Sequence, residues 1–201
     1  MRNVAIMIFP DAELLDFAGP YETFVAATDD DGNRLFNVFT VAEQPGELIA
    51  RAGMRVTPEY TFATAPRIDI LVVPGGYGTR REIDNPVAID WISRVASESE
   101  ITTSVCTGSF LLAKAGLLDG RQATTHWGSI ARMRDMFPNT TVLENIRWVD
   151  AGEVVSSAGV SAGIDMSLHI VERLYGAETA ARTARFMEYD YWPNPNAAAA
   201  D

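Results

Sequence analysis

Residues 101–116 read ITTSVCTGSFLLAKAG and hold the only cysteine of the chain, Cys106. Residues 101–105 form a short β-branched run of the kind that fills a buried strand. From Thr107 onward apolar residues recur at helical spacing, and Gly116 stands where a helix C-cap is expected. The stretch therefore predicts a strand, a turn at Cys106 and a helix, which is the repeating unit of an α/β fold.

Two interpretations of Cys106 follow from this place in the chain. Free N–H groups and the helix macrodipole favour an anion at a helix start, so a thiol with an ordinary pKa of about 8.5 is expected to become substantially thiolate at neutral pH. The alternative is a small buried hydrophobe. A single cysteine excludes an internal disulfide, and we expect a cytoplasmic protein.

Length and composition predict one domain. The chain has 201 residues, of which 47% are hydrophobic and 21% charged, as in ordinary globular proteins. We expect this domain to span residues 1–192, and residues 193–201 have the composition of a loose tail. The net charge of −11 argues against nucleic acid as a partner. No apolar run is long enough for a membrane span, and the N-terminal apolar segment is too short for a signal peptide.

A second strand-to-helix unit opens the chain. Residues 3–9 predict a buried strand, and Gly19 with Pro20 predicts a helix start, which leaves Asp16 in the connection between them. In open α/β sheets such connections bind ligands. Asp16 is therefore either a ligand-binding carboxylate or an ordinary capping or solvent-exposed aspartate.

A third unit, DILVVPGGYG at residues 69–78, is a strand that ends in a glycine-rich turn. It lacks the Lys-Ser/Thr ending of a phosphate loop and the glycine spacing of a dinucleotide fingerprint. Gly75 and Gly76 are candidates for an oxyanion hole, with a simple tight turn as the equal alternative.

Other segments complete the pattern. Residues 36–42 predict a strand, residues 47–64 a hairpin around Gly53 at the sheet's edge with nothing catalytic, and residues 85–98 a helix. The acidic loop at residues 29–32 is a solvated turn rather than a metal site. Repeated strand, turn and helix units imply a parallel sheet.

Two histidines and one serine are of types that can serve in catalysis. His126, which with Trp127 precedes a helix predicted over residues 128–137, is either a base or orienting group near the thiol or a packing or capping residue. GVSAG at residues 159–163 matches a nucleophile elbow around Ser161. The one histidine after it, His169, lies in the helix that this elbow would start and cannot fold back, so we interpret His169 as structural and exclude Ser161 as a nucleophile.

With these pieces in place, the chain resembles the ThiJ/PfpI family of the class I glutamine amidotransferase-like superfamily. Four matches occur in the family's order and spacing: LDFAGPYETF around Asp16, VVPGGYG around Gly75 and Gly76, VCTGSFLLAKAGLLDG around Cys106, and ATTHW followed by SAGVSAGID. The details are most similar to the isocyanide hydratase subgroup. Many members carry glutamate where this chain has Asp16, and peptidase-like members carry histidine where it has Thr107.

The resemblance implies a flavodoxin-like three-layer sandwich, with a mostly parallel sheet and helices on both faces, and a homodimer. It implies a site of Cys106, Asp16 and Thr107 without cofactor or metal. Residues expected to bind substrate or stabilise charge are Gly75, Gly76, His126 and Trp127. Phe17, Tyr77 and Trp127 are candidates for the wall of a hydrophobic pocket or for the core.

The expected reaction is hydration of an isocyanide to an N-substituted formamide through a covalent thioimidate on Cys106. Asp16 supplies the proton and its carboxylate then activates water. Two alternatives remain open: a glyoxalase-like or deglycase enzyme that acts on small aldehydes, and a non-enzymatic sensor like the ligand-binding domains of AraC-type regulators.

Overall fold

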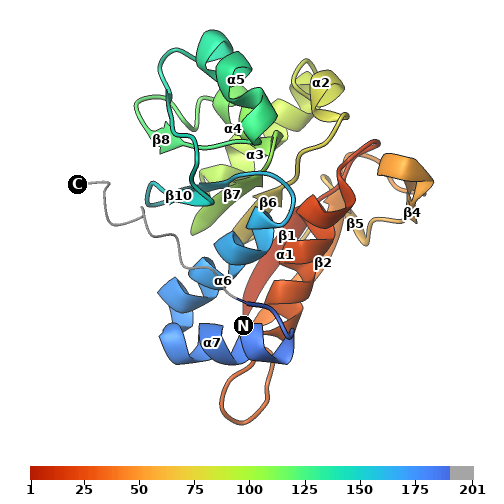
Figure 1. Ribbon diagram of the computed structural model, residues 1–201. Coiled ribbons are helices and arrows are strands. Elements are labelled where there is room, and N and C mark those ends of the chain that lie inside the picture. Colours follow the sequence, from red (N-terminus) through yellow and green to blue (C-terminus); the bar gives the residue numbers. More distant parts are fainter. Residues whose placement is uncertain (191–201) are drawn as a thin grey trace.

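The computed structural model describes residues 1–190, and the predicted tail, residues 193–201, lies outside the described residues. Its central sheet has seven strands in the order β10-β11-β7-β6-β1-β2-β5 (Figure 1). Adjacent strands run parallel except β10, which is antiparallel to β11. Strand bounds are Arg2–Met7 (β1), Phe36–Ala42 (β2), Tyr60–Thr61 (β5), Ile70–Val73 (β6), Ile101–Val105 (β7), Trp148–Asp150 (β10) and Val154–Ser157 (β11).

Helices cover both faces of this sheet (Figure 1). On one face α1, α6 and α7 pack against one another, and on the other α4 contacts β6, β7 and α3. Helix bounds are Leu14–Ala26 (α1), Thr79–Glu82 (α2), Pro86–Ala96 (α3), Gly108–Lys114 (α4), Ile130–Met136 (α5), Ala162–Tyr175 (α6) and Ala177–Phe186 (α7), with 3-10 turns at Arg51–Gly53 (η1) and Trp127–Ser129 (η2). The predicted three-layer α/β sandwich is confirmed.

The central strands explain this arrangement. Every residue of β6 and β7 is buried, as expected for parallel strands that are covered on both faces. Their carboxyl ends meet at one edge of the sheet, where the turns after β6 and β7 lie side by side.

Two sequence predictions were wrong in detail. Helix α1 begins at Leu14, so Pro20 lies inside it rather than at its start, and Asp16 occupies its first turn rather than a connection. The predicted hairpin exists as Leu48–Ile49 (β3) and Arg55–Val56 (β4), but it forms a sheet of its own, apart from the central one. A second pair, Gln122–Ala123 (β8) and Thr141–Val142 (β9), also stands apart.

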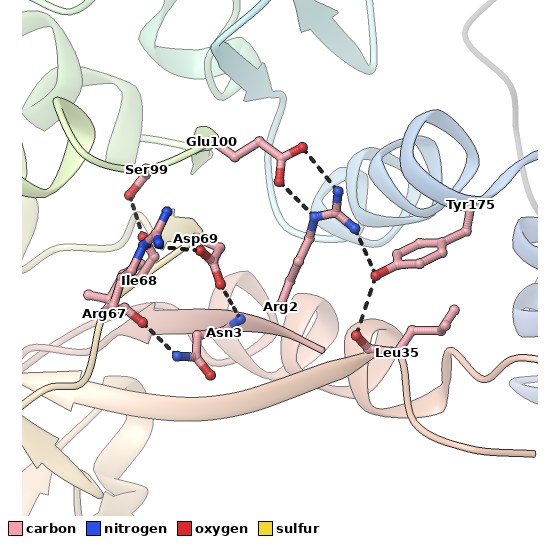
Figure 2. A network of polar contacts seen from close by, with 9 residues as sticks. All are labelled: Arg2, Asn3, Leu35, Arg67, Ile68, Asp69, Ser99, Glu100 and Tyr175. Atoms are coloured by element: carbon pink, nitrogen blue, oxygen red, sulfur yellow. Dashed lines mark hydrogen bonds and ion pairs between the residues drawn. The ribbon is translucent and has the colours of Figure 1, made fainter.

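Polar contacts fasten the opposite, amino-terminal ends of the strands (Figure 2). Arg2 at the start of β1 donates to both carboxylate oxygens of Glu100, at 2.6 and 3.3 Å, and to the hydroxyl of Tyr175 at 2.9 Å. The amide of Asn3 donates to Asp69 just before β6 at 2.8 Å. These contacts join β1 to the residues preceding β6 and β7 and to α6, far from the carboxyl edge.

Within residues 1–190 no helix has both the length and the apolar character needed to cross a bilayer.

Candidate active site

Cys106 lies in the turn between β7 and α4 with a left-handed backbone, φ +57°. Hydrogen bonds of its amide and its carbonyl hold this strained residue. Its amide donates to the carbonyls of Ser157 and Ala158, at 3.2 and 3.1 Å, and its carbonyl accepts from the hydroxyls of Thr125 and Ser109, at 2.9 and 3.0 Å. Strain of this kind persists only where the surroundings over-determine it, and it is common at active sites.

Asp16 reaches the same turn from the first turn of α1 and is fully buried. Its Oδ2 accepts a hydrogen bond from the amide of Gly75 at 2.9 Å, whereas Oδ1 is buried without a hydrogen-bond partner. The capping or solvent-exposed interpretation of Asp16 is therefore excluded. One carboxyl oxygen fixes the side chain, and the other remains available.

Gly75 and Gly76 allow this close approach. A Cβ on Gly75 would lie 2.5 Å from the amide nitrogen of Thr107 and 2.9 Å from Oδ2 of Asp16. Gly76 has φ +121° and donates its amide to Oγ1 of Thr107 at 3.0 Å. Both amides thus already have acceptors within the protein. Neither is a free donor for an oxyanion hole, and their observed role is to hold Asp16 and Thr107.

Thr107 connects the two turns. Besides the Gly76 amide, its hydroxyl lies 3.2 Å from the hydroxyl of Thr79 at the start of α2. Its own amide and hydroxyl interact with the Cys106 sulfur, and both act to lower the pKa of the thiol. The amide of Thr107 is thus the backbone donor that faces the sulfur.

Burial is the largest influence on the pKa values of both Asp16 and Cys106. It raises the pKa of Asp16 from 3.8 to about 7, and the charge of Glu13 acts in the same direction. Burial and then the Asp16 carboxylate raise the pKa of Cys106 to about 12, against smaller effects from Thr107. Burial and the Asp16 carboxylate thus oppose the thiolate that the position of Cys106 at a helix start suggests. Helix α4 has only seven residues, and its macrodipole does not offset the effects of burial and of the neighbouring carboxylate on the pKa of the thiol.

A cavity of about 420 Å³ opens above Cys106. It is lined by Glu13, Arg51, Gly76, Tyr77, Arg80, Cys106, Thr107, His126, Ser129 and Val160. Of the three aromatic residues considered for a hydrophobic wall, only Tyr77 belongs to this lining. Phe17 is buried in the core, and Trp127 is 82% exposed outside the lining.

His126 both lines the cavity and caps a turn. Its Nδ1 accepts a hydrogen bond from the amide of Gly128 at 3.1 Å, so this nitrogen carries no proton. The ring packs on Gly159, where a Cβ would lie 2.3 Å from Cδ2. His126 therefore presents a ring that is held in place from both sides.

Ser161 and His169 belong to other contacts. The hydroxyl of Ser161 accepts from Arg147 at 3.2 Å. His169 lies 2.7 Å from the carboxylate of Asp150 and stacks on Trp148 with ring centroids 3.8 Å apart. Ser161 and His169 therefore do not form a catalytic pair, which agrees with the interpretation from the sequence.

Sequence reasoning missed the charged rim of the cavity. Arg51 lies in η1, inside the hairpin that was expected to carry nothing of interest. It reaches the site because its amide donates to the carbonyl of Ala12 at 3.0 Å and its side chain pairs with Glu13 at 2.7 Å. Arg80 lies in α2, directly after the glycine turn. No local motif marks either arginine.

No group of three or more His, Cys, Asp or Glu side chains within the described part of the chain is placed to hold a metal ion.

Comparison with known proteins agrees with this architecture. Residues 2–173 match the DJ-1/PfpI family. The chain is 31% identical over 188 residues to the isonitrile hydratase of Pseudomonas putida, covering 93% of this chain and 78% of that protein. It is 28% identical to the HTH-type transcriptional regulator GbdR of Pseudomonas aeruginosa, covering 94% of this chain but 51% of the regulator.

Among solved structures, a ThiJ/PfpI family protein from Pseudomonas syringae superposes with a TM-score of 0.84 at 30% identity, covering 96% of this chain and 76% of that one. The family match spans most of the chain, and the relatives agree in both sequence and fold. The chain belongs to the DJ-1/PfpI family.

Proposed function

We propose that this protein is a cysteine-dependent isocyanide hydratase, a lyase that converts R–N≡C to an N-substituted formamide. The observation that carries the proposal is the fully buried Asp16 carboxyl, which interacts with the Cys106 side chain and keeps Oδ1 without another partner. Similarity to an isonitrile hydratase supports the substrate class, isonitrile being another name for isocyanide.

The first step adds the thiol across the terminal carbon. The Asp16 carboxylate takes the proton from Sγ of Cys106, and the sulfur attacks the isocyanide carbon. Asp16 then gives the same proton to that carbon, which leaves the thioimidate R–N=CH–S–Cys106. Because the pKa of Asp16 is raised to about 7, its acid and base forms are both accessible near neutral pH.

The second step is hydrolysis. The Asp16 carboxylate draws a proton from water as the water oxygen bonds to the thioimidate carbon, and Asp16 passes that proton to the nitrogen. The tetrahedral adduct then collapses to R–NH–CHO, and its hydroxyl proton returns to the departing sulfur. Cys106 and Asp16 end in their starting states.

Neighbouring groups have supporting roles. The Thr107 hydroxyl, fixed by the Gly76 amide at 3.0 Å, orients the sulfur or the water, and the Thr107 amide stabilises charge that develops beside the sulfur. The His126 ring forms part of the pocket wall and can position substrate.

The test is turnover of an alkyl isocyanide, measured as formamide formation, with Cys106→Ala and Cys106→Ser as controls. Quenched reactions of the wild type should contain a protein species heavier by the mass of the whole isocyanide, because the thiol adds without a leaving group. Undiminished formamide production by Cys106→Ala would refute the covalent route.

An enzyme that acts on small aldehydes is the rival with the same nucleophile. Parallel assays with methylglyoxal separate the two readings. Turnover of methylglyoxal alone, abolished by Cys106→Ala, would favour the aldehyde reaction.

A sensor role has support from the match to a transcriptional regulator, of which this chain spans about half. A sensor would bind small molecules in the cavity without converting them. Calorimetric binding of an isocyanide without formamide would favour it.

We also propose that the chain forms homodimers, as the family resemblance implies. Sedimentation equilibrium should then give a mass twice that of the 21.9 kDa chain. A monomer at micromolar concentration would contradict this.

A further inference from the structure

Two guanidinium groups gather on one aromatic ring at the mouth of the Cys106 cavity. The Cζ atoms of Arg51 and Arg80 lie 5.0 and 4.7 Å from the ring centroid of Tyr77. All three residues line the cavity, and Tyr77 is 58% exposed at its rim. Stacking on an aromatic face holds a guanidinium while leaving its N–H edge free to bind a ligand.

These two charges are not balanced. Arg51 pairs with Glu13 at 2.7 Å, but Arg80 forms no ion pair with any residue in the range 1–190. The two guanidinium groups repel each other, so an acidic partner for each would be favourable. The chain has acidic side chains in excess, with a net charge of −11, and yet none is paired with Arg80 in the described residues. One cation thus remains over the entrance to the nucleophile.

The rest of the cavity lining has few apolar side chains that could pack against a hydrocarbon substituent. Apart from Tyr77 and Val160, the lining residues carry charged or polar side chains or are glycine and the nucleophile itself. A guanidinium recognises a carboxylate through two parallel N–H···O bonds. The lining therefore suits a small ligand with an anionic end.

We propose that the Cys106 site takes isocyanides whose substituent ends in a carboxylate, with Arg80 binding that carboxylate and Arg51 supporting it. This inference rests on the proposed hydratase function.

The test compares two substrates with the same reacting group and different charge, isocyanoacetate and its methyl ester. We expect the wild type to favour the acid by about tenfold or more in kcat/KM, mainly through KM. Arg80→Gln should remove this preference by lowering kcat/KM for the acid far more than kcat/KM for the ester, and Arg80→Lys should keep part of the preference. Arg94→Gln, which removes an exposed arginine on α3, is the matched control.

A second measurement keeps this inference separate from the hydratase proposal. Iodoacetate and iodoacetamide alkylate thiols by the same chemistry, and only the first carries a carboxylate. Relative to a free thiol in solution, Cys106 should favour iodoacetate, and Arg80→Gln should abolish that bias.

The outcomes separate the two claims. If neither isocyanide reacts but the alkylation bias depends on Arg80, the hydratase proposal fails and the site still selects carboxylates. An equal or better rate with the ester, or an alkylation bias unchanged in Arg80→Gln, overturns the carboxylate inference.

Discussion

The amide of Gly75 donates a 2.9 Å hydrogen bond to Oδ2 of Asp16, and this bond joins the turn after β6 to the first turn of α1. The other oxygen, Oδ1, is buried and has no hydrogen-bond partner. Burial of this carboxyl disfavours its charged form and raises its pKa to about 7. Asp16 is thus held rigidly and kept ready to accept or release a proton beside Cys106.

Asp16→Asn should stabilise the protein at neutral pH while abolishing activity. A carboxyl whose pKa rises from 3.8 to about 7 on folding favours the native state most at low pH, and that advantage is lost as pH rises toward 7. Asparagine does not titrate. Between pH 3.8 and about 7 the free energy of unfolding of the variant should therefore rise relative to that of the wild type, by up to about 4 kcal/mol in all. One pKa unit corresponds to about 1.4 kcal/mol.

Urea unfolding at a series of pH values between about 4 and 8 measures this difference. The gain should grow with pH and level off above the pKa of Asp16. A difference that stays constant across the window would show that Asp16 titrates normally. Formamide production should fall by about a hundredfold or more, the usual effect of removing a general acid–base group.

Alkylation of Cys106 by iodoacetamide should be slow at neutral pH and rise only in alkaline solution. The pKa of the thiol is raised to about 12 by burial and by the Asp16 carboxylate. Asp16→Asn removes the second of these causes, so its alkylation profile should shift to lower pH. A wild-type profile with a midpoint near or below pH 7 would instead restore the activated thiolate that the helix position suggested.

Features of the fold that are determined within one segment can be predicted from the sequence, whereas features that depend on tertiary packing cannot. The strands Phe36–Ala42 and Ile101–Val105 match their predictions because their signals lie within the segments themselves. Every residue of Ile101–Val105 is buried, and in Phe36–Ala42 buried residues recur between more exposed ones. The start of α1 was misplaced because Pro20 resembles an N1 proline, whereas tertiary packing continues the helix through it from Leu14.

The candidate site shows the same division. Asp16, Gly75, Gly76 and Cys106 were predicted at strand-to-helix turns, which converge at one edge of a parallel sheet. Thr107 was implied by the family resemblance. The pKa of Cys106 was misjudged because it depends on burial and on a carboxylate from a distant segment, neither of which the turn encodes. Arg51 was missed for a similar reason, since a hairpin outside the central sheet carries it to the cavity.

Gly75→Ala should reduce the activity by more than its loss of stability alone would explain. The added Cβ would lie 2.5 Å from the Thr107 amide and 2.9 Å from Asp16, so both must move. We expect a loss of about 1–3 kcal/mol in stability and of most activity. Gly116→Ala is the control, because its φ of +77° makes alanine similarly unfavourable while its Cβ would meet open space.

Retained turnover in Gly75→Ala, at a stability loss equal to that of Gly116→Ala, would mean that the close approach of these turns is not needed for catalysis.

Thr107→Val should lower kcat by about ten- to a hundredfold, whereas Thr107→Ser should keep most of the activity. Valine removes the hydroxyl that accepts from the Gly76 amide at 3.0 Å and lies 3.2 Å from the Thr79 hydroxyl, so a part-buried donor loses its acceptor. Because that hydroxyl also lowers the pKa of the Cys106 thiol, its loss should move the alkylation profile to still higher pH. Serine keeps the oxygen and should leave the profile in place. An equal loss of activity in Thr107→Ser would show that keeping the hydroxyl does not keep the activity, which would contradict assigning the effect to the hydrogen bond alone.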